Sequence, residues 1–218
     1  MGAMERSDQV RRAYENPELA RTYEAERSKN RFQRFRAGLE RSMLDRALAS
    51  APPDARILDV ACGTGRLSEY FATRAKTYTG LDASAAMIEQ AKRDHVSAGT
   101  WVRGDAFRLP FPSKTFDAVV STRFLRHLDA KGRLAVFKEL ARVSRGLVIV
   151  ELLLGEGLVW RWKRLTHSTA WSADATPRRP SHTQAVDELA SAGLTVIARH
   201  ALISFISQPH AYVCKVSR

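Results

Sequence analysis

The most informative stretch of this sequence is Ile57-Leu58-Asp59-Val60-Ala61-Cys62-Gly63-Thr64-Gly65-Arg66-Leu67. Its first five residues form a short, mostly apolar run, which predicts a buried strand. The small residues at 61–65 then allow a tight turn and let a ligand approach the backbone. A helix that starts near Leu67 would direct its unpaired N–H groups at the same place. A strand, a small-residue turn and a helix in this order indicate a nucleotide-binding site.

After this turn, the chain alternates between short strands and helices. Apolar runs predict strands at 78–81, 100–103, 116–121 and 147–153, and helical periodicity predicts helices at 67–73, 84–97, 131–143 and 183–192. We expect residues 194–205 and 211–216 to form a closing pair of strands. Alternation of this kind predicts an α/β fold, in which a mostly parallel sheet has helices on both faces.

Two regions lie outside this alternation. The pattern before the first strand predicts amphipathic helices near 8–28 and 31–50, which end before Pro52-Pro53. The tryptophan-rich segment 155–180 interrupts the later part of the sheet pattern. We therefore expect a helical lid over residues 1–53, a nucleotide-binding domain over 54–218, and a substrate cap inserted at 155–180.

Charge around the turn distinguishes between two nucleotide ligands. A dinucleotide would place an anionic pyrophosphate over the turn, where Asp59 would repel it. The dinucleotide fingerprint also needs a third Gly or Ala, and Ser68 occupies that position. The Asp59 carboxylate would instead attract the positively charged ammonium and sulfonium groups of S-adenosylmethionine.

Two further acids follow the next two predicted strands. Asp82 lies at the end of the second strand, where one carboxylate can accept hydrogen bonds from both ribose hydroxyls. Asp105 ends the third strand and could accept the exocyclic amine of adenine, with Phe107 or Leu81 against the ring. Each acid alone could also be a helix cap or a turn residue. Three acids at one edge of a parallel sheet favour a ligand site.

The sequence resembles the class I S-adenosylmethionine-dependent methyltransferases. The similarity covers about residues 55–153 and lies in the motifs Ile57–Leu67, Gly80–Ala91, Gly104–Phe111 and Thr115–Ser121, with Arg126-His127-Leu128 after them. It implies a Rossmann-like sheet of seven mostly parallel strands with an antiparallel last strand. It also implies S-adenosyl-L-methionine as the cofactor and S-adenosyl-L-homocysteine as its product. The cofactor-binding residues that we expect are Asp59, Ala61, Gly63, Gly65, Asp82, Ala83, Met87, Asp105, Ala106, Phe107 and Ser121.

Candidates for catalysis and acceptor binding carry a weaker signal. His127 follows the fourth strand and could act as a base, because histidine titrates near neutral pH. Arg123 could bind an anionic acceptor. We expect the acceptor itself to contact Tyr14, Tyr23, Trp160 and His182. Packing is the simpler role for His127, Tyr14, Tyr23 and Trp160, and Arg123 could simply be a surface arginine, so these residues stay candidates.

Composition sets the remaining limits. The 218 residues carry 35 Lys and Arg against 23 Asp and Glu, for a net charge of +12. This charge suits an anionic acceptor or a nucleic acid, although a solvated arginine-rich surface explains it as well. No cluster has metal-ligand spacing, and no apolar run approaches the roughly 18 residues of a membrane span. Two cysteines give no disulfide framework, and no signal-peptide pattern opens the chain, so we expect a cytoplasmic protein.

These observations favour an enzyme that methylates oxygen or nitrogen of a small-molecule acceptor. An RNA methyltransferase and a non-catalytic protein with the same fold are the alternatives, and the sequence leaves the oligomeric state open.

Overall fold

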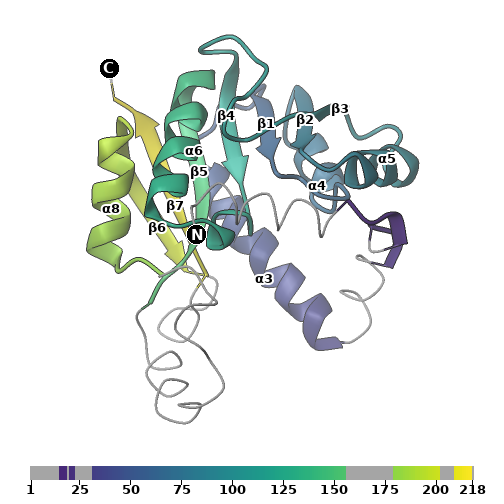
Figure 1. Cartoon of the computed structure of the whole chain (residues 1–218), viewed down its shortest axis with the longest axis horizontal. Helices are drawn as coiled ribbons and strands as arrows, with labels where there is room; N and C mark the ends of the chain where they lie inside the picture. Colours follow the sequence, from purple (N-terminus) through teal and green to yellow (C-terminus); the bar gives the residue numbers. More distant parts are fainter. Residues whose placement is uncertain (1–14, 19, 23–30, 156–178, 202–208, 218) are drawn as a thin grey trace.

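Seven strands form one sheet in the order β3-β2-β1-β4-β5-β7-β6 (Figure 1). The computed structural model describes residues 15–18, 20–22, 31–155, 179–201 and 209–217. The strands are β1 (Arg56–Val60), β2 (Thr77–Asp82), β3 (Thr100–Arg103), β4 (Phe116–Ser121), β5 (Ser144–Leu153), β6 (Leu194–Ala201) and β7 (Pro209–Val216). The first five strands pair in parallel, whereas β7 runs antiparallel to both β5 and β6. The expected seven-stranded Rossmann-like sheet with a reversed last strand is therefore confirmed.

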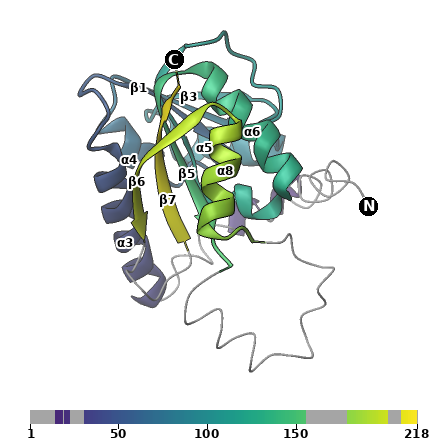
Figure 2. The same cartoon turned by 90° about the vertical axis from the view of Figure 1, so that its left-hand side faces the viewer.

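Helices cover both faces of the sheet (Figure 2). The helices are α3 (Arg31–Leu48), α4 (Ser68–Ala72), α5 (Ala85–Asp94), α6 (Ala130–Val143) and α8 (His182–Ser191), with a 3-10 turn η1 (Leu125–His127) after β4. Successive strand side chains point to opposite faces, so each strand contributes to two cores. Ile57 packs in the core that contains α3 and α4, whereas Leu58 packs in the core that contains α6 and α8.

Local capping explains where several helices begin. Ser84 accepts a hydrogen bond from the Met87 amide, as its position before the predicted helix suggests. That helix ends at Asp94, three residues before the expected end at Ser97. Ser181 and Gln184 form a reciprocal capping box at the start of α8.

The prediction of one helix over 8–28 is wrong at Glu15 and Asn16, which lie outside any helix. Helix begins at Pro17, and the Asn16 carboxamide oxygen accepts a hydrogen bond from the Glu18 amide at 2.9 Å. Asparagine at the cap and proline at the first helical position form a helix start, which explains the break. Residues 8–14 and 23–28 of the predicted helix lie outside the described residues.

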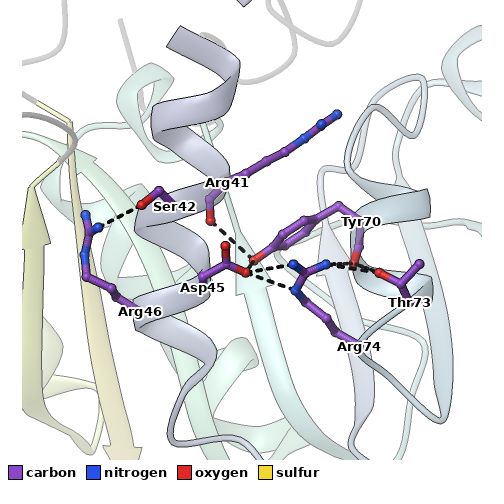
Figure 3. Close-up of polar contacts among 7 residues, drawn as sticks. All are labelled: Arg41, Ser42, Asp45, Arg46, Tyr70, Thr73 and Arg74. Atoms are coloured by element: carbon purple, nitrogen blue, oxygen red, sulfur yellow. Dashed lines mark hydrogen bonds and ion pairs between the residues drawn. The ribbon is translucent and has the colours of Figure 1, made fainter. Parts of the chain in front are cut away.

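Helix α3 packs tightly against the sheet. Its Met43, Leu44 and Ala47 side chains are fully buried against strand residues and α4. Its polar contacts reach α4 as well, because Asp45 accepts a hydrogen bond from the Tyr70 hydroxyl at 2.8 Å and pairs with Arg74 at 3.0 Å (Figure 3). This helix is thus part of the folded core, and a lid role for residues 1–53 stays a prediction.

Replacing Leu44 by alanine tests this packing. We expect Leu44→Ala to lower the free energy of unfolding by about 2–5 kcal/mol, since it removes a buried side chain and leaves a cavity. Phe35→Ala on the same helix is the control, because Phe35 is 61% exposed and its loss should change little. Urea unfolding monitored by circular dichroism measures both effects. Equal values for the two variants would contradict the packing described for α3.

Candidate functional site

The carboxyl ends of β1, β2 and β4 meet at one edge of the sheet. The turn after β1 lies beside the end of β2, because the Cys62 amide donates to the Leu81 carbonyl at 3.0 Å. On the other side of β1, the buried Ser121 hydroxyl donates to the Val60 carbonyl at 3.0 Å. The residues that the sequence places at three separate strand ends are therefore neighbours, as expected for a parallel sheet.

The turn itself depends on left-handed backbone conformations. Ala61, Gly63 and Gly65 have φ angles of 62°, 60° and 81°. A side chain at Gly65 would collide with the Trp101 indole, whereas a Cβ at Gly63 would meet no atom within 4 Å. Gly65 is thus needed for packing inside the protein, and Gly63 leaves an open side that a ligand can approach.

Asp82 connects this turn to the next helix. One of its carboxylate oxygens accepts from the Gly63 amide and the other from the Ser84 amide, both at 2.9 Å. Burial raises the pKa of Asp82, although these backbone hydrogen bonds oppose the rise. A carboxylate oxygen has two lone pairs, so each can still accept a ribose hydroxyl beside Gly63.

Asp59 has one buried oxygen without a partner. Its Oδ2 accepts from the Tyr78 hydroxyl at 3.2 Å, and its Oδ1 has no hydrogen bond in the structure. Burial raises the pKa of this carboxyl from 3.8 to about 7. A cation near this edge would satisfy Oδ1 and favour the charged form. Together with the open side of Gly63, this orphaned acceptor fits the ammonium-bearing end of S-adenosylmethionine.

The positions of the residues expected around adenine do not by themselves indicate a ligand site. Asp105 is exposed, and its Oδ1 accepts from the Phe107 amide at 2.9 Å, which makes it at least a turn residue. Ala106 and Met87 are buried, while Phe107 and Ala83 are half-buried. The loop that contains Asp105 is fixed from α6, because Arg142 donates to the Leu109 and Phe111 carbonyls and Glu139 accepts from the Leu109 amide.

Glu40 on α3 is a site residue that the sequence reasoning missed. Its side chain is 3% exposed and pairs with Arg66 at 2.8 Å and with Arg123 at 2.7 Å. Burial opposes ionisation of Glu40, but the two guanidinium groups outweigh it and lower its pKa. Arg123, which has a φ of 60°, donates from two nitrogens to this carboxylate. Its hydrogen bonds to Glu40 place it in the framework of the site.

A second buried acid lies near this cluster. Glu151 on β5 is 6% exposed, and burial raises its pKa. The charge of Glu40 adds to this rise, whereas Arg126, Arg123 and Arg66 oppose it.

The remaining candidate residues lie apart from this cluster. His127 lies half-buried in η1, and His182 Nδ1 lies 2.9 Å from the Tyr212 hydroxyl on the α8 side of the sheet. Tyr14, Tyr23 and Trp160 lie outside the described residues.

Two kinds of feature are absent from the described residues. No group of three or more His, Cys, Asp or Glu side chains there could hold a metal ion. No helix in the same part of the chain is long and apolar enough to cross a bilayer.

Known proteins share both the sequence pattern and the fold. Residues 57–146 match a family model described as a methyltransferase domain. The chain is 33% identical over 141 residues to malonyl-[acyl-carrier protein] O-methyltransferase of Pectobacterium atrosepticum, which covers 62% of this chain and 54% of that protein. It is 46% identical over 94 residues to fatty-acid O-methyltransferase of Mycolicibacterium smegmatis, which covers 41% of this chain and 33% of that protein. The chain thus spans about half or less of the length of these relatives.

A solved structure supports the fold assignment. Magnesium protoporphyrin IX methyltransferase from Synechocystis, with bound S-adenosylhomocysteine, superposes with a TM-score of 0.70 at 16% identity, over 86% of this chain and 88% of that one. The fold is that of methyltransferases that bind S-adenosylmethionine, and the glycine turn lies within the residues that match the methyltransferase domain. The chain is similar to the class I S-adenosylmethionine-dependent methyltransferases in the sequence of residues 57–146 and in its fold.

Removing the charge of Glu40 should destabilise the protein. Glu40→Gln leaves two partly buried arginines without their counter-charge, and we expect a loss of about 3 kcal/mol in the free energy of unfolding. Glu89→Gln is the control, because the Glu89–Lys92 pair is exposed and should contribute less than about 1 kcal/mol. Chemical denaturation measures both variants. A loss no larger than that of the control would show that Glu40 does not hold the cluster.

The raised pKa of Asp59 predicts a pH dependence of stability. Between about pH 4 and 7, folded Asp59 keeps a proton that the unfolded chain has released, so its contribution to stability falls as pH rises through this window. Asp59→Asn removes this contribution. As the pH rises from 4.5 to 7.5, we expect the free energy of unfolding of the variant to increase by a few kcal/mol relative to that of the original protein. Urea unfolding measures both proteins. A constant difference across this range would contradict the burial of an uncharged Asp59.

Proposed function

We propose that this protein transfers the methyl group of S-adenosylmethionine to an oxygen or nitrogen atom of a small-molecule acceptor. The observation that carries the proposal is the pairing of Asp82 with the open glycine of the turn, at 2.9 Å from the Gly63 amide. An acid and an unobstructed backbone at the same strand edge suit a nucleoside ligand. The partnerless oxygen of Asp59 adds a place for positive charge.

The residues proposed to hold the cofactor divide by position. Asp59, Ala61, Gly63 and Gly65 would surround the methionine part, and Asp82 would accept from the ribose hydroxyls. Ala83 and Met87 would lie beside the ribose. Asp105, Ala106 and Phe107 are proposed to contact adenine. Ser121 would support the turn from β4 through its bond to the Val60 carbonyl.

The chain's own contribution to catalysis is orientation. S-adenosylmethionine carries a methyl group that its sulfonium has already activated. The protein therefore needs to hold the acceptor in line and exclude water, with a base only where the acceptor is protonated. We propose His127 for that base, because it lies in η1 directly after the β4 edge.

The acceptor is proposed to bind beyond β4 and β5. Residues 155–180 would form a cap there, with Tyr14, Tyr23, Trp160 and His182 as acceptor contacts. Both curated relatives described above are O-methyltransferases by name, which favours oxygen over nitrogen. An anionic acceptor suits the net charge of +12.

Fewer observations support the two alternatives, an RNA methyltransferase and a non-catalytic protein with the same fold. The charge also suits RNA as the substrate. A protein of this fold need not be a methyltransferase, since the [4+2]-cyclase SpnF superposes with a TM-score of 0.64 at 16% identity. Cofactor binding therefore has to be measured directly.

Asp82→Ala tests the proposal. We expect this substitution to weaken binding of S-adenosylhomocysteine by about 1–3 kcal/mol, because the ribose hydroxyls lose their acceptor. Isothermal titration calorimetry gives the affinity, and Asp187→Ala on the exposed surface of α8 is the control. The thermal midpoint of each variant is measured too, since Asp82 also anchors the Gly63 and Ser84 amides. Unchanged affinity would refute the ribose assignment.

A further inference from the structure

The first turns of α3 extend past the carboxyl edge of the sheet (Figure 1). Glu40 lies level with this edge, because it pairs with Arg66 after β1 and with Arg123 after β4. Arg36 lies one turn earlier on the same side of the helix, and it is exposed whereas Glu40 is buried. The helix thus leaves the described core between these two residues, and residues 31–39 reach up to about 13 Å beyond the edge.

The exposed part of α3 is positively charged. Its exposed arginines are Arg31, Arg34, Arg36 and Arg41, and residues 31–39 contain no Asp or Glu. Arg31 and Arg34 lie three positions apart, where two like charges slightly destabilise a helix. An anionic partner would remove this repulsion.

The acids of α3 do not neutralise these arginines. Glu40 is bound in the cluster described above, and Asp45 pairs with Arg74. In Figure 3 the Arg41 side chain extends away from the helix, and no contact joins its guanidinium group to the residues drawn. Among the described residues, no carboxylate forms an ion pair with any of the four exposed arginines.

Phe35 lies among these arginines. Its side chain is 61% exposed, and a Cβ at Gly38, one turn further along, would meet no atom within 4 Å. The outer face of α3 is the side opposite its buried residues, and by helical periodicity it contains Arg31, Arg34, Phe35 and Arg41. Arginines and an exposed aromatic ring together are typical of helices that lie on a membrane surface.

We propose that the outer face of α3 binds the surface of a bilayer that contains anionic lipids. The arginines would contact the lipid phosphates, and the Phe35 ring would enter the boundary between the headgroups and the acyl chains. Because these turns project from the protein, a flat surface can reach all of them at once. Docking of this kind does not depend on the proposed methyl transfer, and it would turn the edge that carries the proposed cofactor residues towards the membrane.

A nucleic acid would also attract these arginines. Proteins that bind single strands place aromatic rings along a positively charged groove. Phe35 instead lies on the open side of one projecting helix, which a bilayer fits better. Binding of RNA is therefore an outcome that the experiment has to separate from binding of lipid.

The experiment measures sedimentation of the whole chain with sucrose-loaded vesicles. One set of vesicles contains phosphatidylcholine alone, and the other contains equal amounts of phosphatidylcholine and phosphatidylglycerol. We expect binding to the second set alone, and weaker binding as salt is added. Arg31→Gln, Arg34→Gln and Arg41→Gln should each weaken this binding about fivefold, and the triple variant about a hundredfold. Phe35→Ala should weaken it about tenfold, because the ring no longer enters the bilayer.

A triple variant with the same loss of charge is the control. Lys114→Gln, Lys138→Gln and Lys215→Gln remove three exposed positive charges from other parts of the surface. This variant should bind anionic vesicles as the original protein does. Circular dichroism checks that every variant is folded.

Three results with vesicles would overturn the proposal: no binding of the original protein to anionic vesicles, equal losses in the two triple variants, or unchanged binding of Phe35→Ala. Binding of an RNA oligonucleotide that depends on the three arginines, without binding to vesicles, would overturn it as well and assign the outer face to a nucleic acid. S-adenosylhomocysteine affinity is measured in parallel by isothermal titration calorimetry. Its absence in the original protein would refute the methyltransferase function and leave the docking surface untouched, whereas its retention in every α3 variant shows that the loss of vesicle binding is local.

Discussion

The site depends on one buried carboxylate. Glu40 lies between Arg66, which follows the glycine turn, and Arg123, which follows β4. The three residues come from a helix and two loops that share no backbone hydrogen bonds in a sheet. The two ion pairs of Glu40 therefore connect these three segments, whereas backbone hydrogen bonds connect the strands of the sheet. Arg123 also has a left-handed conformation, with a φ of 60°, that residues with a side chain seldom adopt.

Much of the fold could be predicted from the sequence, because the decisive signals are local. Apolar runs such as Leu147–Leu153 are buried on both faces, and a parallel sheet requires this pattern. Asp82 and the glycine turn could be expected to meet, since parallel pairing aligns the ends of β1 and β2. The helix start at Asn16-Pro17 carried a local signal too, and the prediction of a longer helix overlooked it.

The rest could not be predicted, because it depends on contacts between distant residues. Glu40 and Arg123 are 83 positions apart, and nothing near either one indicates a partner. In the sequence, an arginine that follows a strand could bind an anionic ligand or pair with an Asp or Glu of its own chain. Only the arrangement in space separates Arg123, which is paired with Glu40, from Arg126, which forms no ion pair within the described residues. The burial that raises the pKa of Asp59 is likewise a property of the whole core.

The Trp101 indole has a consequence for how this region can vary. Its ring fills the space that side chains at both Gly65 and Gly80 would need. The two glycines lie on different segments, yet a single ring restricts both. We therefore expect these three positions to change together among related sequences, with a smaller residue at 101 wherever alanine replaces glycine at position 80. Gly65 has less freedom than Gly80, because its positive φ would still disfavour a side chain after the ring is gone.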